Sequence, residues 1–141
     1  MSEEVFLGFA DGTSCHTQNL ASTAWVIYSP ASQLIVSSGP CLGPTTNNVV
    51  EYSVVIELLG YSIMHDILYL EVCLDSQLVT SQLNGEYRVR DLILLQHFLH
   101  IRFLEHQFIY IIYNHIPRNR NTVADAYANY VLDWHMYHLI T

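Results

Sequence analysis

The spacing of apolar residues changes several times along this 141-residue chain, and these changes limit the folds it can adopt. Residues 5–38 carry short apolar runs separated by turn residues, which is typical of β-strands. Residues 52–63 then place apolar side chains at helical spacing, and later segments alternate between the two patterns. A chain of this kind is predicted to form an α/β domain with a mixed sheet.

The expected elements follow the order β-β-β-α-β-α-α-β-α. Three strands form an antiparallel meander and two further strands return after helices, which gives a five-stranded mixed sheet flanked by helices. The strands are expected at residues 5–10, 23–29, 33–38, 67–74 and 107–115, and the first is expected to lead into a turn at Asp11-Gly12. The first helix is expected from Thr45 or Thr46 to residue 63, and the second at 76–83, where Asn84-Gly85 stops it. The third is expected at 91–106, with Leu92, Leu95, Leu99 and Phe103 on one face, and the last after an Asn121 cap.

Length and composition indicate one domain spanning residues 1–141. Apolar residues make up 51% of the chain, yet no run approaches the ~20 residues of a membrane helix, so no membrane partner is expected. The start, Met-Ser-Glu-Glu, lacks the basic and apolar regions of a secretion signal. We therefore expect an intracellular protein, cytoplasmic or nuclear and not secreted, whose three cysteines are reduced and buried.

The charge balance is strongly acidic. Thirteen acidic residues face five arginines and no lysine, which gives a formal net charge of -8. Phosphate contacts normally come from Lys and Arg, so this balance argues against a general nucleic-acid-binding surface. All five arginines lie between residues 88 and 120, and the available positive charge is therefore concentrated.

Four acidic residues stand in four separate short motifs: Asp11, Glu51, Asp75 and Asp125. Asp11 and Asp75 are expected at the carboxyl ends of strands, while the other two fall in the first turns of helices. Strand ends and helix starts meet at one edge of an open α/β sheet, where ligands usually bind. Carboxylates in apolar surroundings are tolerated mainly when a cation neutralises them, so this pattern points to divalent metal and phosphoryl-transfer chemistry.

Five co-linear segments closely resemble the ribonuclease H type 1 family, in its bacterial/archaeal-like or retroelement-associated branch. The segments are residues 11–14 (Asp-Gly-Thr-Ser), 46–52 (Thr-Asn-Asn-Val-Val-Glu-Tyr), 74–79 (Leu-Asp-Ser-Gln-Leu-Val), 82–91 (Gln-Leu-Asn-Gly-Glu-Tyr-Arg-Val-Arg-Asp), and 115–118 (His-Ile-Pro-Arg) followed by 121–129 (Asn-Thr-Val-Ala-Asp-Ala-Tyr-Ala-Asn). Together they cover nearly the whole chain, and the resemblance implies a ribonuclease H-like fold.

The resemblance also implies an activity, namely metal-dependent endonucleolytic hydrolysis of the RNA strand of an RNA/DNA hybrid. The family holds two Mg²⁺ ions, for which Mn²⁺ can substitute. By resemblance, Asp11 bridges both ions, Glu51 and Asp75 hold one, and Asp125 holds the other. Two hard cations close together need several oxygen ligands, which agrees with this set.

The same resemblance assigns substrate contacts to neighbouring residues. Asn47, Asn48, Gln77 and the segment at Ser14 correspond to the family's contacts with minor-groove bases and 2′-hydroxyls. Amide side chains suit that task because they both donate and accept hydrogen bonds. The alternative for these polar residues is helix capping and turn formation.

Three residues near the end of the last expected strand have two interpretations. His115 stands ten residues before Asp125, where some family members carry a proton-shuttling histidine, but here it falls in a strand and a structural role is the alternative. Arg118 is a candidate substrate contact, and Arg118 or Arg120 could stabilise developing charge near the metals. The alternative for both is a solvated loop charge.

Departures from the family pattern leave other functions open. Residues 15–21 contain no glycine, and the chain has no lysine-rich protrusion to grip a hybrid. Affinity for the hybrid is therefore expected to be modest and salt-dependent, or to depend on a partner domain. The chain could act as a homodimer or as part of a larger polyprotein. One alternative is an inactive ribonuclease H-like module of a retroelement-type polyprotein. Another is a resolvase or integrase-type nuclease, which uses a different order of acids.

Overall fold

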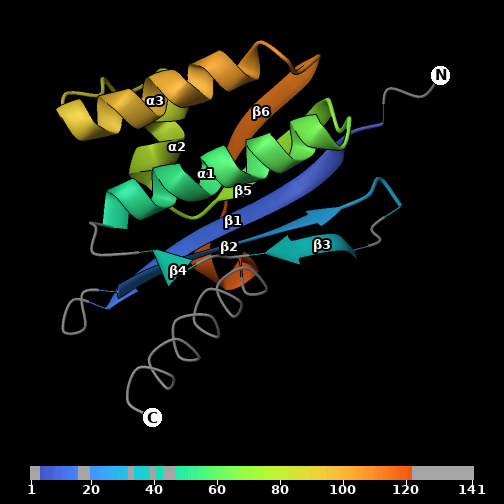
Figure 1. Ribbon diagram of the computed structural model, residues 1–141, viewed down its shortest axis with the longest axis horizontal. Coiled ribbons are helices and arrows are strands. Elements are labelled where there is room, and N and C mark those ends of the chain that lie inside the picture. Colours follow the sequence, from blue (N-terminus) through green and yellow to red (C-terminus); the bar gives the residue numbers. More distant parts are fainter. Residues whose placement is uncertain (1–3, 16–19, 32–33, 39–40, 43–46, 122–141) are drawn as a thin grey trace.

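The computed structural model describes residues 4–15, 20–31, 34–38, 41–42 and 47–121 (Figure 1). Its strands are β1 (Phe6–Cys15), β2 (Leu20–Tyr28), β3 (Leu34–Ser38), β4 (Cys41–Leu42), β5 (Tyr69–Leu74) and β6 (Tyr110–His115). Its helices are α1 (Asn47–Met64), α2 (Gln77–Leu83), α3 (Leu92–Glu105) and the short 3-10 helix η1 (Arg118–Arg120). The final helix expected after Asn121 lies outside the described residues.

The strands form one mixed sheet in the order β3-β2-β1-β5-β6, with β4 paired to β2. Strand β2 is antiparallel to both β1 and β3, whereas β5 runs parallel to β1 and β6 parallel to β5. The predicted α/β class and mixed sheet are therefore confirmed. The expected count of five strands is wrong, because the two-residue segment β4 adds a sixth through the pairs Ala21↔Leu42 and Ser22↔Cys41.

The three α-helices lie on the same side of the sheet, with α1 and α3 next to each other (Figure 1). Helix α1 packs across β1 and β2. Its residues Val54 and Leu58 are fully buried, as are Leu70 and Val72 of β5 and Ile27 of β2. This continuous apolar core fixes the first turns of α1 over the middle of β1.

Strand β1 continues past the Asp11-Gly12 pair, which the sequence suggested to be a turn. Asp11 pairs with Ala24 of β2 and Gly12 pairs with Thr23. The parallel pairing of β1 with β5 nevertheless stops at Ala10↔Leu74. The expectation that Asp11 lies at the end of its strand is therefore wrong. Asp11 is instead the first residue of β1 beyond the end of the neighbouring strand β5.

Helix α2 begins directly after Asp75. Ser76 caps it by accepting a hydrogen bond from the Val79 amide at 3.3 Å. Asn84 is the C-cap residue of α2. Gly85 follows with a φ of 78°, which glycine adopts without steric cost. This confirms the stop that Asn84-Gly85 predicted for this helix.

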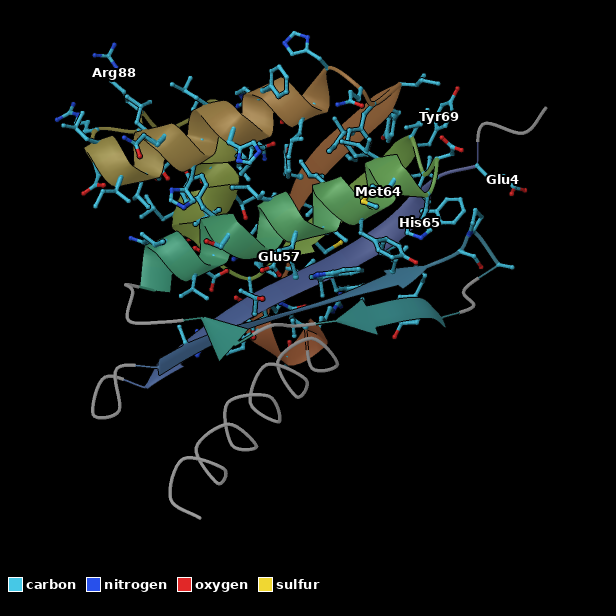
Figure 2. All side chains as sticks on the ribbon, in the orientation of Figure 1. Glu4, Glu57, Met64, His65, Tyr69 and Arg88 are labelled. Atoms are coloured by element: carbon cyan, nitrogen blue, oxygen red, sulfur yellow. The ribbon has the colours of Figure 1, made fainter. Side chains whose placement is uncertain are left out.

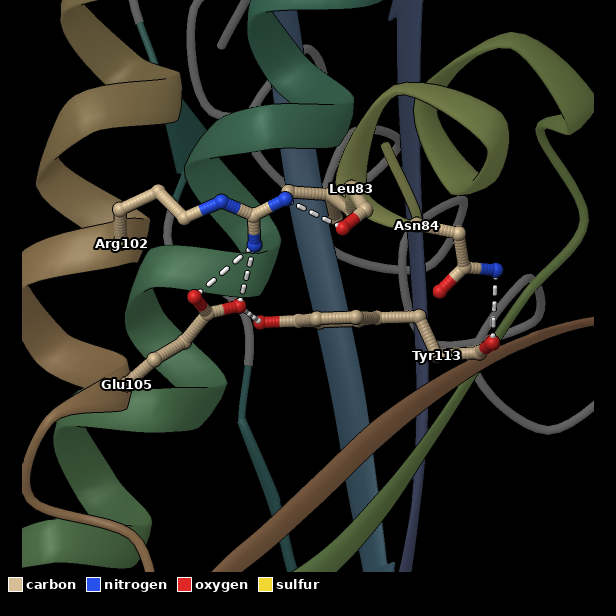
Figure 3. Close-up of polar contacts among 5 residues, drawn as sticks. All are labelled: Leu83, Asn84, Arg102, Glu105 and Tyr113. Atoms are coloured by element: carbon tan, nitrogen blue, oxygen red, sulfur yellow. Dashed lines mark hydrogen bonds and ion pairs between the residues drawn. The ribbon is translucent and has the colours of Figure 1, made fainter. Parts of the chain in front are cut away.

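A polar network joins α2, α3 and β6 (Figure 3). The Arg102 guanidinium donates to both carboxylate oxygens of Glu105, at 2.8 and 2.7 Å, and to the Leu83 carbonyl at the end of α2. The buried Tyr113 of β6 donates its hydroxyl to Glu105 at 2.6 Å, and Asn84 donates to the Tyr113 carbonyl. The network joins the end of α2, which follows Asp75, to α3 and to β6.

Helix α3 buries a different face from the apolar one noted in the sequence. Leu94 and Ile101 face the core, whereas Leu92, Leu99 and Phe103 are 75%, 56% and 70% exposed. None of the helices in the described part of the chain is long and apolar enough to span a membrane.

The thiol of Cys73 is buried, and the carboxyl of Glu57 is half-buried. Cys73 is a buried free thiol, as expected, and burial raises its pKa to about 11; the side chains of Cys15 and Cys41 lie outside the description. Glu57 lies on the lower side of α1, toward the sheet (Figure 2), where it accepts a hydrogen bond from the buried Thr23 hydroxyl at 2.7 Å.

Candidate metal centre

Three of the four predicted acids converge at one place in the fold. Asp11 comes from the middle of β1, Glu51 from the start of α1, and Asp75 from the residue after β5. One carboxylate oxygen of each lies within 4.8 Å of the others. The three acids therefore lie together at one edge of the sheet, as expected, although Asp11 comes from within β1 and not from its end. Asp125 lies outside the described residues.

Gly12 allows α1 to approach β1 closely enough to bring Glu51 to Asp11. A Cβ atom at this position would lie 2.2 Å from Cγ1 of Val50, far inside van der Waals contact. Val50 directly precedes Glu51 and is fully buried. The missing side chain at residue 12 thus sets the distance between strand and helix on which the cluster depends.

The Glu51 carboxyl is held in an unfavourable environment for its charge. Burial, and secondly the neighbouring Asp75 carboxylate, raise its pKa to about 8, while the Arg118 guanidinium lowers it in part. Its Oε2 atom is buried and has no hydrogen-bond partner among the described residues. A buried acceptor without a donor is costly, and a cation placed among the three carboxylates would satisfy it.

The donor set fits a hard divalent cation. All three side chains offer carboxylate oxygens, which are the ligands that Mg²⁺ and Ca²⁺ prefer. No histidine or cysteine belongs to the cluster in the part of the chain that the structure describes, which makes a soft-metal site a poorer fit. Asp11 is only 5% exposed, so the cluster is closed on the side of the sheet.

The backbone and side chain of Asp75 have separate partners. His115, at the exposed end of β6, places Nε2 3.3 Å from the Asp75 carbonyl oxygen. The side-chain amide of Asn121 donates to the Asp75 carboxylate at 3.2 Å and to the Ala10 carbonyl at 3.0 Å. The sequence suggested only a helix-capping role for Asn121, because nothing local to residue 121 reveals contacts with residues so far away along the chain.

The other predicted site residues are placed as follows. Asn48 is half-buried in the first turn of α1, and the exposed Gln77 opens α2 two residues after Asp75. Arg118 is exposed in η1 and acts electrostatically on Glu51. The side chains of Ser14 and Asn47 are outside what the structure describes.

Comparison with known sequences decides the family. The profile of the Reverse transcriptase-like family matches residues 9–131, which include all four acids. The ribonuclease HI of Halobacterium salinarum is 33% identical over 125 residues, which cover 89% of this chain and 63% of that protein. The chain belongs to the ribonuclease H type 1 family. The family resemblance that the sequence motifs indicated is thus confirmed.

Solved ribonuclease H1 structures share the fold. The crystal structure of the Halobacterium salinarum protein superposes with a TM-score of 0.87 at 32% identity, covering 92% of this chain and 98% of that one. LC11-RNase H1, solved in complex with an RNA/DNA hybrid, gives 0.85 at 28% identity, covering 93% and 99%.

Another relative is much longer than this chain. The bifunctional protein Rv2228c of Mycobacterium tuberculosis is 34% identical over 125 residues, which cover 88% of this chain but only 34% of that protein. The chain thus spans about a third of that relative. The solved N-terminal RNase H domain of Rv2228c superposes on this chain with a TM-score of 0.88.

The raised pKa of Glu51 predicts a pH-dependent stability of the metal-free protein. Between pH 4.5 and about 8 the folded protein keeps a proton on Glu51 that the unfolded chain has released, so the free energy of unfolding falls as pH rises through this window. The Glu51→Gln variant cannot ionise at residue 51. In EDTA, we expect it to gain stability over the parent protein progressively from pH 4.5 to 8.

Urea unfolding of both proteins in EDTA, at intervals between pH 4.5 and 8.5, measures this difference. The exposed Glu86 on the α2–α3 connection provides the matched control, and Glu86→Gln should show no comparable trend. A stability difference between Glu51→Gln and its parent that stays constant across the range would contradict the burial of an ionisable carboxyl at this site.

Proposed function

We propose that this protein is a metal-dependent endonuclease that hydrolyses the RNA strand of RNA/DNA hybrids. The observation that carries the proposal is the cluster of Asp11, Glu51 and Asp75, whose ligand atoms lie within 4.8 Å of one another. Its setting supports the proposal, since the fold superposes with a TM-score of 0.85 on a ribonuclease H1 solved with such a hybrid.

The proposed cofactor is a pair of Mg²⁺ ions, for which Mn²⁺ substitutes. Asp11 is proposed to contact both ions, Glu51 and Asp75 to hold one, and Asp125 to hold the other. When bound, the metal supplies Lewis-acid activation of water and of the phosphate. The all-oxygen cluster and the unpartnered Oε2 of Glu51 support this assignment.

The protein's own groups prepare the site for a cation. Glu51 has to release its proton before it can act as a ligand, because its pKa near 8 leaves it largely protonated at neutral pH in the metal-free protein. The positive charge of Arg118 favours that release. We propose that Arg118, which is exposed in η1, also contacts a substrate phosphate.

Recognition of the RNA strand is proposed for polar side chains next to the acids. Asn48 is one helical turn before Glu51, and Gln77 opens the helix that follows Asp75. Their amides can donate to and accept from a 2′-hydroxyl, the group that distinguishes RNA from DNA. We extend the same role, on the sequence resemblance alone, to Asn47 and Ser14.

His115 is the candidate proton carrier. Its ring is exposed, and Nε2 lies against the Asp75 carbonyl rather than against a carboxylate. To carry a proton to the leaving oxygen the ring has to turn away from that carbonyl, which its position at the exposed end of β6 permits.

Substrate affinity is proposed to be modest and to fall steeply with salt. Arg102 is engaged with Glu105 and Leu83, which leaves Arg88, Arg90, Arg118 and Arg120 as the exposed cations of the described residues. Four arginines on a chain of net charge -8 neutralise few phosphates. A further domain or a second copy that adds positive charge would raise the affinity for the hybrid.

A substrate panel tests the proposal. Labelled RNA/DNA hybrid, duplex RNA and duplex DNA are each incubated with the protein in Mg²⁺, Mn²⁺ or EDTA. We expect the protein to cleave only the RNA strand of the hybrid, and neither duplex RNA nor duplex DNA. Cleavage is expected with Mg²⁺ or Mn²⁺ and not in EDTA. Binding of hybrid without cleavage would instead indicate an inactive module, and cleavage of duplex DNA would indicate another nuclease class.

A further inference from the structure

Asn121 is a buried amide that lies behind the acidic cluster. It is 1% exposed and directly follows η1. Its Nδ2 donates to the Ala10 carbonyl at 3.0 Å and to Oδ2 of Asp75 at 3.2 Å. One amide group therefore contacts the residue before Asp11 on β1 and the acid that follows β5.

These two contacts restrain the Asp75 carboxylate. The Ala10 carbonyl belongs to a paired strand of the central sheet, so it provides a fixed anchor for the amide. With one hydrogen given to that anchor, the other can point only in a narrow range of directions, and Asp75 Oδ2 lies in that range. A ligating carboxylate that is held by a neighbouring donor presents its remaining lone pairs in a defined direction.

The oxygen of the Asn121 amide has a different status from its nitrogen in the described part of the chain. The Oδ1 atom of Asn121 is buried and has no hydrogen-bond partner among the described residues. A buried acceptor without a donor costs free energy, whereas an apolar side chain of similar size would avoid that cost. Within the described residues, the two donated hydrogen bonds are therefore the only ones that the Asn121 side chain makes.

We propose that Asn121 is a positioning residue, which orients the Asp75 carboxylate so that it can ligate a divalent cation together with Asp11 and Glu51. The proposal rests on the metal-dependent function proposed above. It also differs from the capping role that the sequence suggested, because a helix cap uses the side-chain oxygen as an acceptor, whereas positioning uses the side-chain nitrogen as a donor.

Two substitutions separate these roles. Asn121→Ala removes both the donor and the acceptor. Asn121→Ser keeps a strong N-cap acceptor, but its hydroxyl is too short to span from the Ala10 carbonyl to Asp75. The matched control is Asn119→Ala, which removes the same kind of side chain from an exposed position in η1.

The test measures three quantities for each variant: Mn²⁺ affinity of the free protein by calorimetry, kcat and KM on labelled hybrid, and the melting temperature in EDTA. We expect Asn121→Ala and Asn121→Ser to lower Mn²⁺ affinity and kcat by about 10–100-fold, with KM changed little and the melting temperature close to that of the parent protein. Asn119→Ala should match the parent protein in all three.

Several results would overturn the proposal. If Asn121→Ser behaved as the parent protein while Asn121→Ala did not, capping would explain the residue. If affinity and kcat fell only together with a large drop in melting temperature, the role would be structural. Failure of the parent protein to cleave hybrid while it still binds Mn²⁺ would reject the proposed function alone, since the affinity measurement continues to test Asn121.

Discussion

Replacing Asp75 with Asn is expected to lower the rate of hybrid cleavage by about 1,000-fold or more, because metal ligation at a reacting phosphate supplies several kcal/mol of transition-state stabilisation. The substitution keeps the shape of the side chain and removes one of three carboxyl groups whose ligand atoms lie within 4.8 Å of one another. The Asn121 amide can still donate to the remaining carbonyl oxygen of residue 75. The fold should therefore survive while the metal site fails.

Single-turnover cleavage of labelled hybrid at saturating Mg²⁺ measures this effect. The control is Asp66→Asn, the same chemical change in an exposed turn whose φ of 57° asparagine tolerates well. Asp66→Asn should cleave at the parental rate. If Asp75→Asn also did so, the assignment of the acidic cluster as the active site would be wrong.

Adding a single methyl group at Gly12 is expected to damage both stability and activity. The new Cβ would lie 2.2 Å from Cγ1 of Val50, so α1 or β1 has to move. Overpacking of this kind costs about 1–3 kcal/mol of unfolding free energy. Since Glu51 directly follows Val50, the same displacement misplaces a ligand, and a shift near 1 Å can cost about 100-fold in rate.

Denaturant unfolding and the cleavage assay together check the Gly12→Ala variant. Gly60→Ala is the matched control, because a Cβ on that helical glycine has no neighbour within 4 Å and should stabilise α1 by about 0.5–1 kcal/mol. Combining Gly12→Ala with Val50→Ala removes the closest clash, so the double variant should lose less stability than the two single losses added. A Gly12→Ala protein as stable as Gly60→Ala would contradict the close approach of α1 to β1.

Much of the fold could be predicted because local patterns and tertiary structure agree. The period-2 and helical runs placed the strands and helices close to their observed bounds, and Asn84-Gly85 marked the end of α2 correctly. The Asp11-Gly12 pair was misleading, since pairing with β2 keeps it extended despite its turn propensity. Strand β4 was missed because two residues show no period at all.

The site was predictable to the extent that its residues stand in recognisable motifs. The three carboxylates meet as the motifs and expected elements implied. Asn121 was not predictable, because its partners Ala10 and Asp75 are 111 and 46 residues away. The raised pKa of Glu51 was likewise hidden, since it arises from burial that only the packing of α1 against β1 creates.

The most direct test of the account is to identify the ends of the RNA fragments produced from an RNA/DNA hybrid in Mg²⁺. Attack by water under metal catalysis breaks the bond to the 3′ oxygen and leaves 3′-hydroxyl and 5′-phosphate ends. The account predicts these ends with the parent protein, and no fragments in EDTA or with Asp75→Asn. Intact hybrid in Mg²⁺, cleavage that persists in EDTA, or fragments ending in a 2′,3′-cyclic phosphate would contradict it.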